Sequence, residues 1–263
     1  MCHSAAIVIN IGMTTEIVHS RKPVCLLGAG QVSARSVKEI LLIAPTLVAA
    51  DGGANVAIRA GVIPDAVIGD LDSVSRRTLA AVPAARVHHV SEQETTDFEK
   101  CLTRIAAPVV LCLGFTGARV DHALSVWNAL VRYPDRRAII LSREDLAFAA
   151  PPRLALPLAP GTRVSLYPMA QVRAQSNGLY WPVDEVAFAP DGAIGTSNRA
   201  TGTMTLEVSG PGMIVILPRI ELADGLGQGG QQRTGFEGAR ADATLRHGLG
   251  DGSEGGHDSP SAR

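Results

Sequence analysis

The chain has 263 residues, which is enough for one large domain or two smaller ones. Its 24 basic and 25 acidic residues nearly balance, which argues against a dedicated nucleic-acid-binding protein, since such a protein needs a strongly basic face. Hydrophobic residues make up 46% of the chain, too many for a disordered protein. No apolar run approaches the roughly 20 residues that span a membrane, and no signal segment is evident, so we expect a cytoplasmic protein.

Apolar runs alternate with helical stretches from residue 24 to residue 141. The apolar runs predict short strands at 24–28, 47–50, 66–69, 86–90, 109–113 and 138–141. Apolar residues at helical spacing predict helices at 31–43, 54–60, 96–106 and 121–131. Such alternation is typical of a mostly parallel sheet covered by helices.

The pattern changes near residue 151, where four prolines within ten residues predict a linker or edge segment. Strand-like runs without helical period follow at 163–168, 185–189, 203–209 and 213–217. We therefore predict an α/β fold with two domains. The expected boundaries are an N-terminal extension at 1–22, an α/β domain at 23–150, an all-β sandwich domain at 151–220 and a flexible glycine-rich tail at 221–263.

Carboxylates follow successive predicted strands of the first domain. Asp51 ends one apolar run, Asp70 and Asp72 end the next, and Asp97 opens a helix. Because ligands of open α/β sheets bind at the carboxyl ends of strands, these side chains are expected at one edge. Asp70 and Asp72 share a face if their segment is extended, and clustered carboxylates need a cation such as Mg²⁺. The alternative is that each Asp caps a helix or a turn.

Two glycine-containing loops also join a strand to a helix. Residues 114–122 either present backbone N–H groups and Arg119 to a phosphate or form a loop with a capping Asp and a surface Arg. Gly28 and Gly30 either cradle a phosphate or form a tight turn. Lys100 shares a helix face with Asp97, so it either neutralises phosphate charge or forms an intrahelical ion pair.

The acidic motifs resemble those of the thiamine pyrophosphokinase family in order and spacing, at residues 50–55, 64–73 and 93–100. Residues 117–122 are similar to the family's Gly-Gly-Arg-x-Asp-His segment, although Ala118 replaces the second glycine. Gly178-Leu179-Tyr180-Trp181-Pro182 and Thr196-Ser197-Asn198 look like its C-terminal motifs. The resemblance covers about residues 23–218.

This resemblance implies a homodimer whose active sites lie between the α/β domain of one chain and the β-domain of the other. It implies transfer of pyrophosphate from ATP to the thiamine hydroxyl, which gives thiamine diphosphate and AMP. Asp70, Asp72 and Asp97 are then expected to hold Mg²⁺, and Lys100 and Arg119 to offset charge on the transferred group. The residues expected to bind nucleotide or thiamine are Asp51, Gly28, Gly30, Asp121, His122, Gln93, Trp181, Ser197 and Asn198.

Some roles and functions stay open on the residues alone. Trp181 either packs on a thiamine ring or belongs to the core of the β-domain. The hydroxyl proton goes to Asp70 or Asp97. The alternative functions are a pyrophosphokinase for another hydroxymethyl heterocycle such as a pterin, a non-catalytic thiamine- or nucleotide-binding protein, and a metal-dependent phosphohydrolase.

Overall fold

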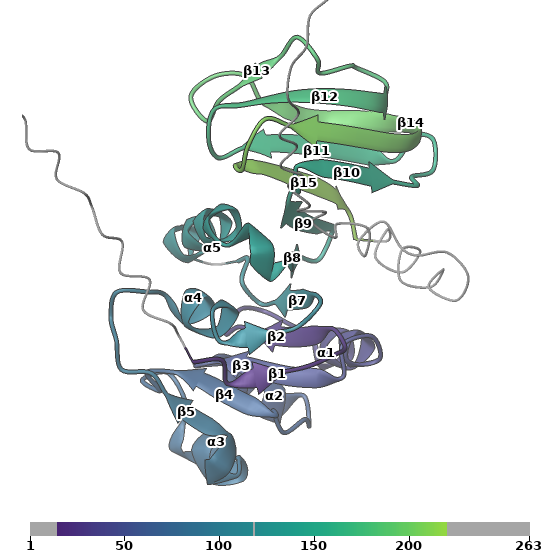
Figure 1. Ribbon diagram of the computed structural model, residues 1–263. Coiled ribbons are helices and arrows are strands. Elements are labelled where there is room, and N and C mark those ends of the chain that lie inside the picture. The colour runs from purple at the N-terminus through teal and green to yellow at the C-terminus, as the bar shows by residue number, and fades with distance from the viewer. Residues whose placement is uncertain (1–14, 118, 220–263) are drawn as a thin grey trace, which may run out of the picture.

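The computed structural model describes residues 15–117 and 119–219 (Figure 1). Most of the expected N-terminal extension, Ala118 and all of the expected tail lie outside these described residues. Within the described part of the chain, no helix has both the length and the apolar character needed to cross a membrane.

The first half of the chain contains a parallel sheet in the order β8-β7-β2-β3-β4-β5. Its strands are β2 (Val24–Leu27), β3 (Thr46–Ala50), β4 (Ala66–Gly69), β5 (Val87–His89), β7 (Val110–Leu113) and β8 (Ala138–Leu141). Every residue of β2, β4, β7 and β8 is buried. Strands covered on both faces need apolar residues at every position, which explains why the sequence shows continuous apolar runs here.

Helices cover both faces of this parallel sheet. The helices are α1 (Ala34–Leu41), α2 (Gly53–Arg59), α3 (Arg76–Ala81), α4 (Asp97–Leu102) and α5 (Val120–Arg132), with 3₁₀ turns at Ala84–Arg86 and Pro134–Arg136. Alternate residues of β2 divide between two cores: Cys25 and Leu27 pack with α1 and α2, whereas Val24 and Leu26 pack with α4 and α5. The side chains of α4 therefore share one core with those of α5.

One predicted helix is shorter than expected, and one helix was not predicted. The predicted helix at 96–106 ends at Leu102, because Ile105–Ala106 is β6, which pairs in parallel with β1 (Val18–His19). Helix α3 was not expected, since its sequence opens with two arginines and lacks a clear apolar period. Ser75 starts it by accepting a hydrogen bond from the backbone N–H of Thr78, as an N-cap residue does.

The second half is antiparallel and continues the hydrogen-bonded ladder of the first half. Strand β9 (Asp145–Ala149) pairs antiparallel with both β8 and β15, so the pairing changes direction there (Figure 1). The remaining strands are β10 (Arg153–Leu156), β11 (Arg163–Pro168), β12 (Val172–Leu179), β13 (Ala187–Phe188), β14 (Gly195–Val208) and β15 (Met213–Pro218). The antiparallel strands extend the parallel strands of residues 24–141 into one larger mixed sheet.

The proline-rich segment near residue 151 forms an edge strand rather than a linker, which agrees with the second of the two alternatives predicted for it. It contains β10, which pairs antiparallel with the second part of β14. The run predicted at 203–209 is also only part of β14, which begins at Gly195 and bends at a bulge opposite Val164 and Leu166. A division into separate domains at residue 151 stays a prediction.

Candidate active site

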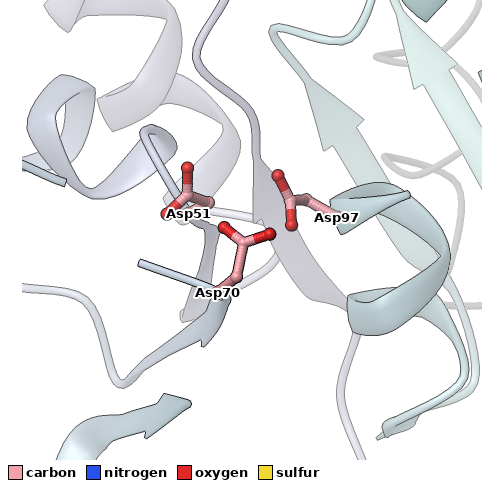
Figure 2. Close-up of side chains that lie close together, drawn as sticks. All are labelled: Asp51, Asp70 and Asp97. Atoms are coloured by element: carbon pink, nitrogen blue, oxygen red, sulfur yellow. The ribbon is translucent and has the colours of Figure 1, made fainter. Parts of the chain in front are cut away.

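Three carboxylates meet at the carboxyl edge of the parallel strands (Figure 2). Asp51 follows β3, Asp70 follows β4, and Asp97 is the first residue of α4. One oxygen from each carboxylate lies within 4.8 Å of the others. We call these residues the carboxylate trio; their spacing suits a shared cation.

The backbone between β3 and β4 allows this close approach. Asp51 has a φ of 41°, a left-handed conformation that is uncommon for a residue with a side chain. A Cβ atom at Gly69 would lie 2.8 Å from the Cβ of Asp51, so only glycine fits beside it. Strained backbone of this kind often accompanies a functional site.

Asp51 has one carboxylate oxygen without a partner among the described residues. The side chain is buried, and its Oδ2 accepts a hydrogen bond from the backbone N–H of Ser73 at 3.2 Å, whereas Oδ1 accepts none. Burial raises the pKa of Asp51, and the charges of Asp72 and Asp70 add to this effect. Since a buried unpaired carboxylate oxygen is costly, a cation bound by the trio would satisfy it.

Lys100 places a buried ammonium group beside the trio. Its side chain is 2% exposed, and Nζ donates to Oδ2 of Asp70 at 3.0 Å and to Oδ1 of Asp97 at 3.3 Å. Burial favours a lower pKa for Lys100, but its contacts with Asp70 and Asp97 outweigh burial and raise the pKa. One ammonium group does not neutralise three carboxylates, so the trio can bind a further cation.

The two carboxylates that contact Lys100 respond differently. The hydrogen bond from Lys100 is the main reason that the pKa of Asp70 lies below its usual value. Burial raises the pKa of Asp97, although the charge of Lys100 opposes the rise. Asp97 therefore binds a proton more readily than Asp70, although both carboxylates contact Lys100.

Asp72 does not join the trio, and the shared face expected for Asp70 and Asp72 is wrong. Leu71, between them, has a φ of 66°, so the segment is not extended there. Asp72 is exposed, and its Oδ1 accepts a hydrogen bond from the Ser73 hydroxyl at 2.8 Å. Its charge still raises the pKa of Asp51, so Asp72 lies within electrostatic reach of the trio. Its role as a metal ligand stays a prediction.

The loop before α4 is held by its own polar side chains. Gln93, expected to contact thiamine, donates from Nε2 to Oδ2 of Asp70 at 3.2 Å. Glu92 accepts hydrogen bonds from the backbone N–H groups of Glu94 and Thr95 and from the Thr95 hydroxyl. Glu92 therefore shapes the loop, a role that was not predicted because it depends mainly on contacts with backbone N–H groups.

The predicted phosphate-binding glycines have a packing role. A Cβ atom at Gly28 or at Gly30 would lie 2.6 Å from the carbonyl oxygen of Gly114. These glycines therefore let the loops after β2 and β7 touch. The strand order reverses between β2 and β7, and ligands of open α/β sheets bind at such a point. Phosphate binding by Gly28 and Gly30 stays a prediction.

Arg119 pairs locally rather than with the trio. Its Nη2 lies 2.5 Å from Oδ2 of Asp121, its Nε donates to Oδ1 at 3.2 Å, and both side chains are exposed. Arg119 lowers the pKa of Asp121 to about 2. His122 is also exposed, at the start of α5. A role for Arg119, Asp121 or His122 in binding phosphate stays a prediction.

Trp181, one of the predicted thiamine-binding residues of the second half, forms an exposed aromatic pair with Tyr180. Tyr180 and Trp181 are 53% and 54% exposed, with ring centroids 4.7 Å apart, so the alternative that Trp181 is a core residue is wrong. The guanidinium of Arg199 lies over both rings, 3.9 Å from the Tyr180 centroid and 5.3 Å from that of Trp181. Arg199 was not among the residues predicted from the sequence, although it directly follows Asn198.

Asn198 holds the backbone of Trp181 from both sides. Its Oδ1 accepts from the Trp181 N–H at 3.2 Å, and its Nδ2 donates to the Trp181 carbonyl at 2.7 Å. Ser197 is exposed with a φ of 62°, and its N–H donates to Oγ of Ser165 at 3.0 Å. The buried Asn198 thus positions the aromatic pair, and its expected contact with thiamine stays a prediction.

Comparisons with known proteins agree with this geometry. Residues 37–141, which include the trio and Lys100, match the family described as "Thiamin pyrophosphokinase, catalytic domain". The resemblance to the thiamine pyrophosphokinase family is thereby confirmed. Thiamine pyrophosphokinase 1 of Arabidopsis thaliana is 29% identical, and the match covers 57% of this chain and 68% of that protein. Thiamine pyrophosphokinase 3 of Oryza sativa subsp. japonica is 30% identical, with 51% and 58% covered.

Solved thiamin pyrophosphokinase structures share the fold. That from Candida albicans superposes with a TM-score of 0.65 at 16% identity, covering 76% of this chain and 93% of that chain. That from Geobacillus thermodenitrificans gives 0.62 at 20% identity, covering 74% and 96%. These likenesses extend beyond residue 141 into the antiparallel half.

Proposed function

We propose that this chain is a thiamine diphosphokinase, which transfers a pyrophosphoryl group from ATP to thiamine. The thiamine hydroxyl oxygen bonds to the β-phosphorus, the bond to the α-phosphate oxygen breaks, and AMP leaves as the hydroxyl proton is released. The observation that carries the proposal is the carboxylate trio around the buried Lys100, inside the segment that matches the family.

The trio fits Mg²⁺ by its chemistry and by its unpaired oxygen. Asp51, Asp70 and Asp97 offer the hard oxygen ligands that Mg²⁺ prefers, and Oδ1 of Asp51 lacks another partner among the described residues. Asp72, exposed beside them, is proposed to complete the set. Bound there, Mg²⁺ would offset the triphosphate charge and orient the triphosphate.

The remaining polar residues act on the reacting groups and on each other. Lys100 is already fixed by Asp70 and Asp97, so its ammonium offsets charge without reorganisation. One of these two carboxylates receives the hydroxyl proton. Gln93 holds Asp70 in the direction that the contact with Lys100 requires. Arg119 is proposed to approach the phosphates.

Thiamine is proposed to pack on the exposed ring of Trp181. Strands β12 and β14 lie at one end of the sheet order, and β3 and β4 lie at the other. We therefore propose a cytoplasmic homodimer in which the aromatic pair of one copy faces the trio of its partner. An exposed aromatic pair held by Asn198 supports this arrangement, since such pairs are typical of binding surfaces.

The experiment is product identification by mass spectrometry. The protein is incubated with ATP, Mg²⁺ and either thiamine or a hydroxymethylpterin, alongside an Asp97→Asn variant as a matched inactive control. AMP and thiamine diphosphate from wild type alone support the proposal. A diphosphorylated pterin, free phosphate with ADP, or no turnover would each assign the trio to another function.

A further inference from the structure

Helix α4 is short, yet it carries two residues of the candidate site. It has six residues, with Asp97 first and Lys100 fourth. Helices of this length are not stable on their own, so contacts with the rest of the protein must fix its position. Small shifts of α4 would move Asp97 and Lys100 together relative to Asp70, which directly follows β4.

Glu99 fixes the first turn of α4 with one of its two carboxylate oxygens. Oε2 accepts hydrogen bonds from the backbone N–H of Thr96 at 3.2 Å and from the Thr96 hydroxyl at 3.1 Å. Oγ1 of Thr96 in turn accepts from the Glu99 N–H at 3.3 Å, which completes a capping box. The other oxygen, Oε1, takes no part in the box.

Oε1 of Glu99 accepts a hydrogen bond from Nη1 of Arg132 at 2.7 Å. Arg132 is the last residue of α5, and its side chain is 54% exposed, whereas that of Glu99 is 8% exposed. Arg132 thus reaches from the surface to a buried carboxylate, and a buried carboxylate needs such a partner. The capping box alone does not require a cation, so this ion pair adds a link between α4 and α5.

We propose that Glu99 and Arg132 are positioning residues, whose ion pair holds α4 so that Asp97 and Lys100 face Asp70. The inference deepens the proposed function and rests on it. Neither residue contacts the reacting groups; both act through Asp97 and Lys100. Partners that orient a metal-binding side chain typically change metal affinity or activity by about 10- to 100-fold when they are removed.

The test is a double-mutant cycle with two conservative changes. Arg132→Met keeps the length of the side chain and removes its charge, and Glu99→Gln keeps an oxygen for the capping box. Because each change breaks the same ion pair, the double variant should resemble either single variant. Arg132→Lys should recover part of the loss. Arg35→Met is the matched control, since Arg35 forms an exposed ion pair with Glu39 on α1.

Three readouts separate positioning from general stability: kcat, KM for thiamine, and the affinity for free Mn²⁺ measured by electron paramagnetic resonance. We expect Arg132→Met to lower kcat and Mn²⁺ affinity by about 10-fold, with KM for thiamine close to wild type. Arg132→Met should also lower thermal stability, because the buried Glu99 carboxylate loses its cation, whereas Glu99→Gln leaves no unpaired buried charge and should stay close to wild type. Unchanged kcat and Mn²⁺ affinity, additive effects on kcat in the cycle, or no recovery with lysine would each overturn the proposal. If wild type makes no thiamine diphosphate, the proposed function fails, while the Mn²⁺ cycle still decides whether the ion pair positions α4.

Discussion

The ammonium group of Lys100 lies 3.0 Å from Oδ2 of Asp70, although the two residues are 30 positions apart in the sequence. This contact joins α4 to the end of β4. Because Lys100 is buried and also contacts Asp97, it fixes two of the three carboxylates before any ligand binds. Such preorganisation is the usual requirement of phosphoryl-transfer sites.

Replacing Lys100 with Met should therefore damage both the site and the fold. The change leaves Asp70 and Asp97 beside each other without a cation. Asp97 is 37% exposed, so the expected loss of unfolding free energy is about 1–3 kcal/mol, less than for a fully buried pair. Urea unfolding measures the loss, and AMP release should fall by orders of magnitude. Wild-type stability together with wild-type AMP release would contradict this role for Lys100.

Replacing Asp51 with Asn should separate metal binding from stability. The raised pKa of Asp51 means that its native state binds a proton more tightly than its unfolded state. Its favourable contribution to stability is thus fully present below the unfolded pKa of about 3.9 and disappears as pH rises through the higher native value. At neutral pH without metal, the variant should be at least as stable as wild type, and this advantage should vanish in acid.

The measurement is unfolding free energy against pH, in EDTA and again in Mg²⁺. Mg²⁺ should stabilise wild type and leave Asp51→Asn unchanged, because only wild type offers the unpaired carboxylate oxygen. A variant that is less stable than wild type in EDTA at neutral pH would show that burial and the neighbouring charges do not penalise the ionised Asp51 carboxylate.

Asp72→Asn tests a residue that the structure leaves outside the trio. Asp72 is exposed, so the unfolding free energy should change little. Its charge acts on Asp51, and we expect turnover to fall by orders of magnitude if Asp72 completes the metal site. The assay is AMP release at saturating ATP, thiamine and Mg²⁺. Near-normal AMP release would remove Asp72 from the ligand set.

Trp181→Ala and Asn198→Ala should weaken thiamine binding in different ways. Trp181 is exposed, so its loss should raise KM for thiamine without changing stability. Asn198 is buried and bonded to both backbone groups of Trp181, so its loss should also cost about 1–3 kcal/mol. Thermal unfolding and thiamine titrations distinguish the two. An unchanged KM in both variants would place thiamine elsewhere.

The sequence predicted that Asp51 and Asp70 lie at one edge of the sheet, because the position of a residue after a strand is a local property, but it assigned Asp72 rather than Asp51 to the metal. Asp51 and Asp70 follow apolar runs, and parallel strands end at one edge. The placement of Asp72 was not predictable, because the left-handed conformation of Leu71 has no signal such as a glycine. The contact between Glu99 and Arg132 joins residues 33 positions apart on two helices, and one sequence carries no record of such pairing.

In the fold, too, the buried strands were predictable from the local sequence, whereas pairing between distant segments was not. Continuous apolar runs predicted β2, β4, β7 and β8 because these strands are buried on both faces. The prolines near residue 151 left a linker and an edge segment open, and the pairing of Arg153 with Glu207 in β14 decides for the edge strand β10. Long-range pairing therefore settled what the local signal left open.

The most direct test of the central claim uses ATP labelled at the β-phosphorus, with thiamine and Mg²⁺. Transfer of the pyrophosphoryl group should move the label into thiamine diphosphate and form an equal amount of unlabelled AMP. Label retained in ADP, or released as inorganic phosphate, would contradict attack at the β-phosphorus and with it the proposed pyrophosphoryl transfer.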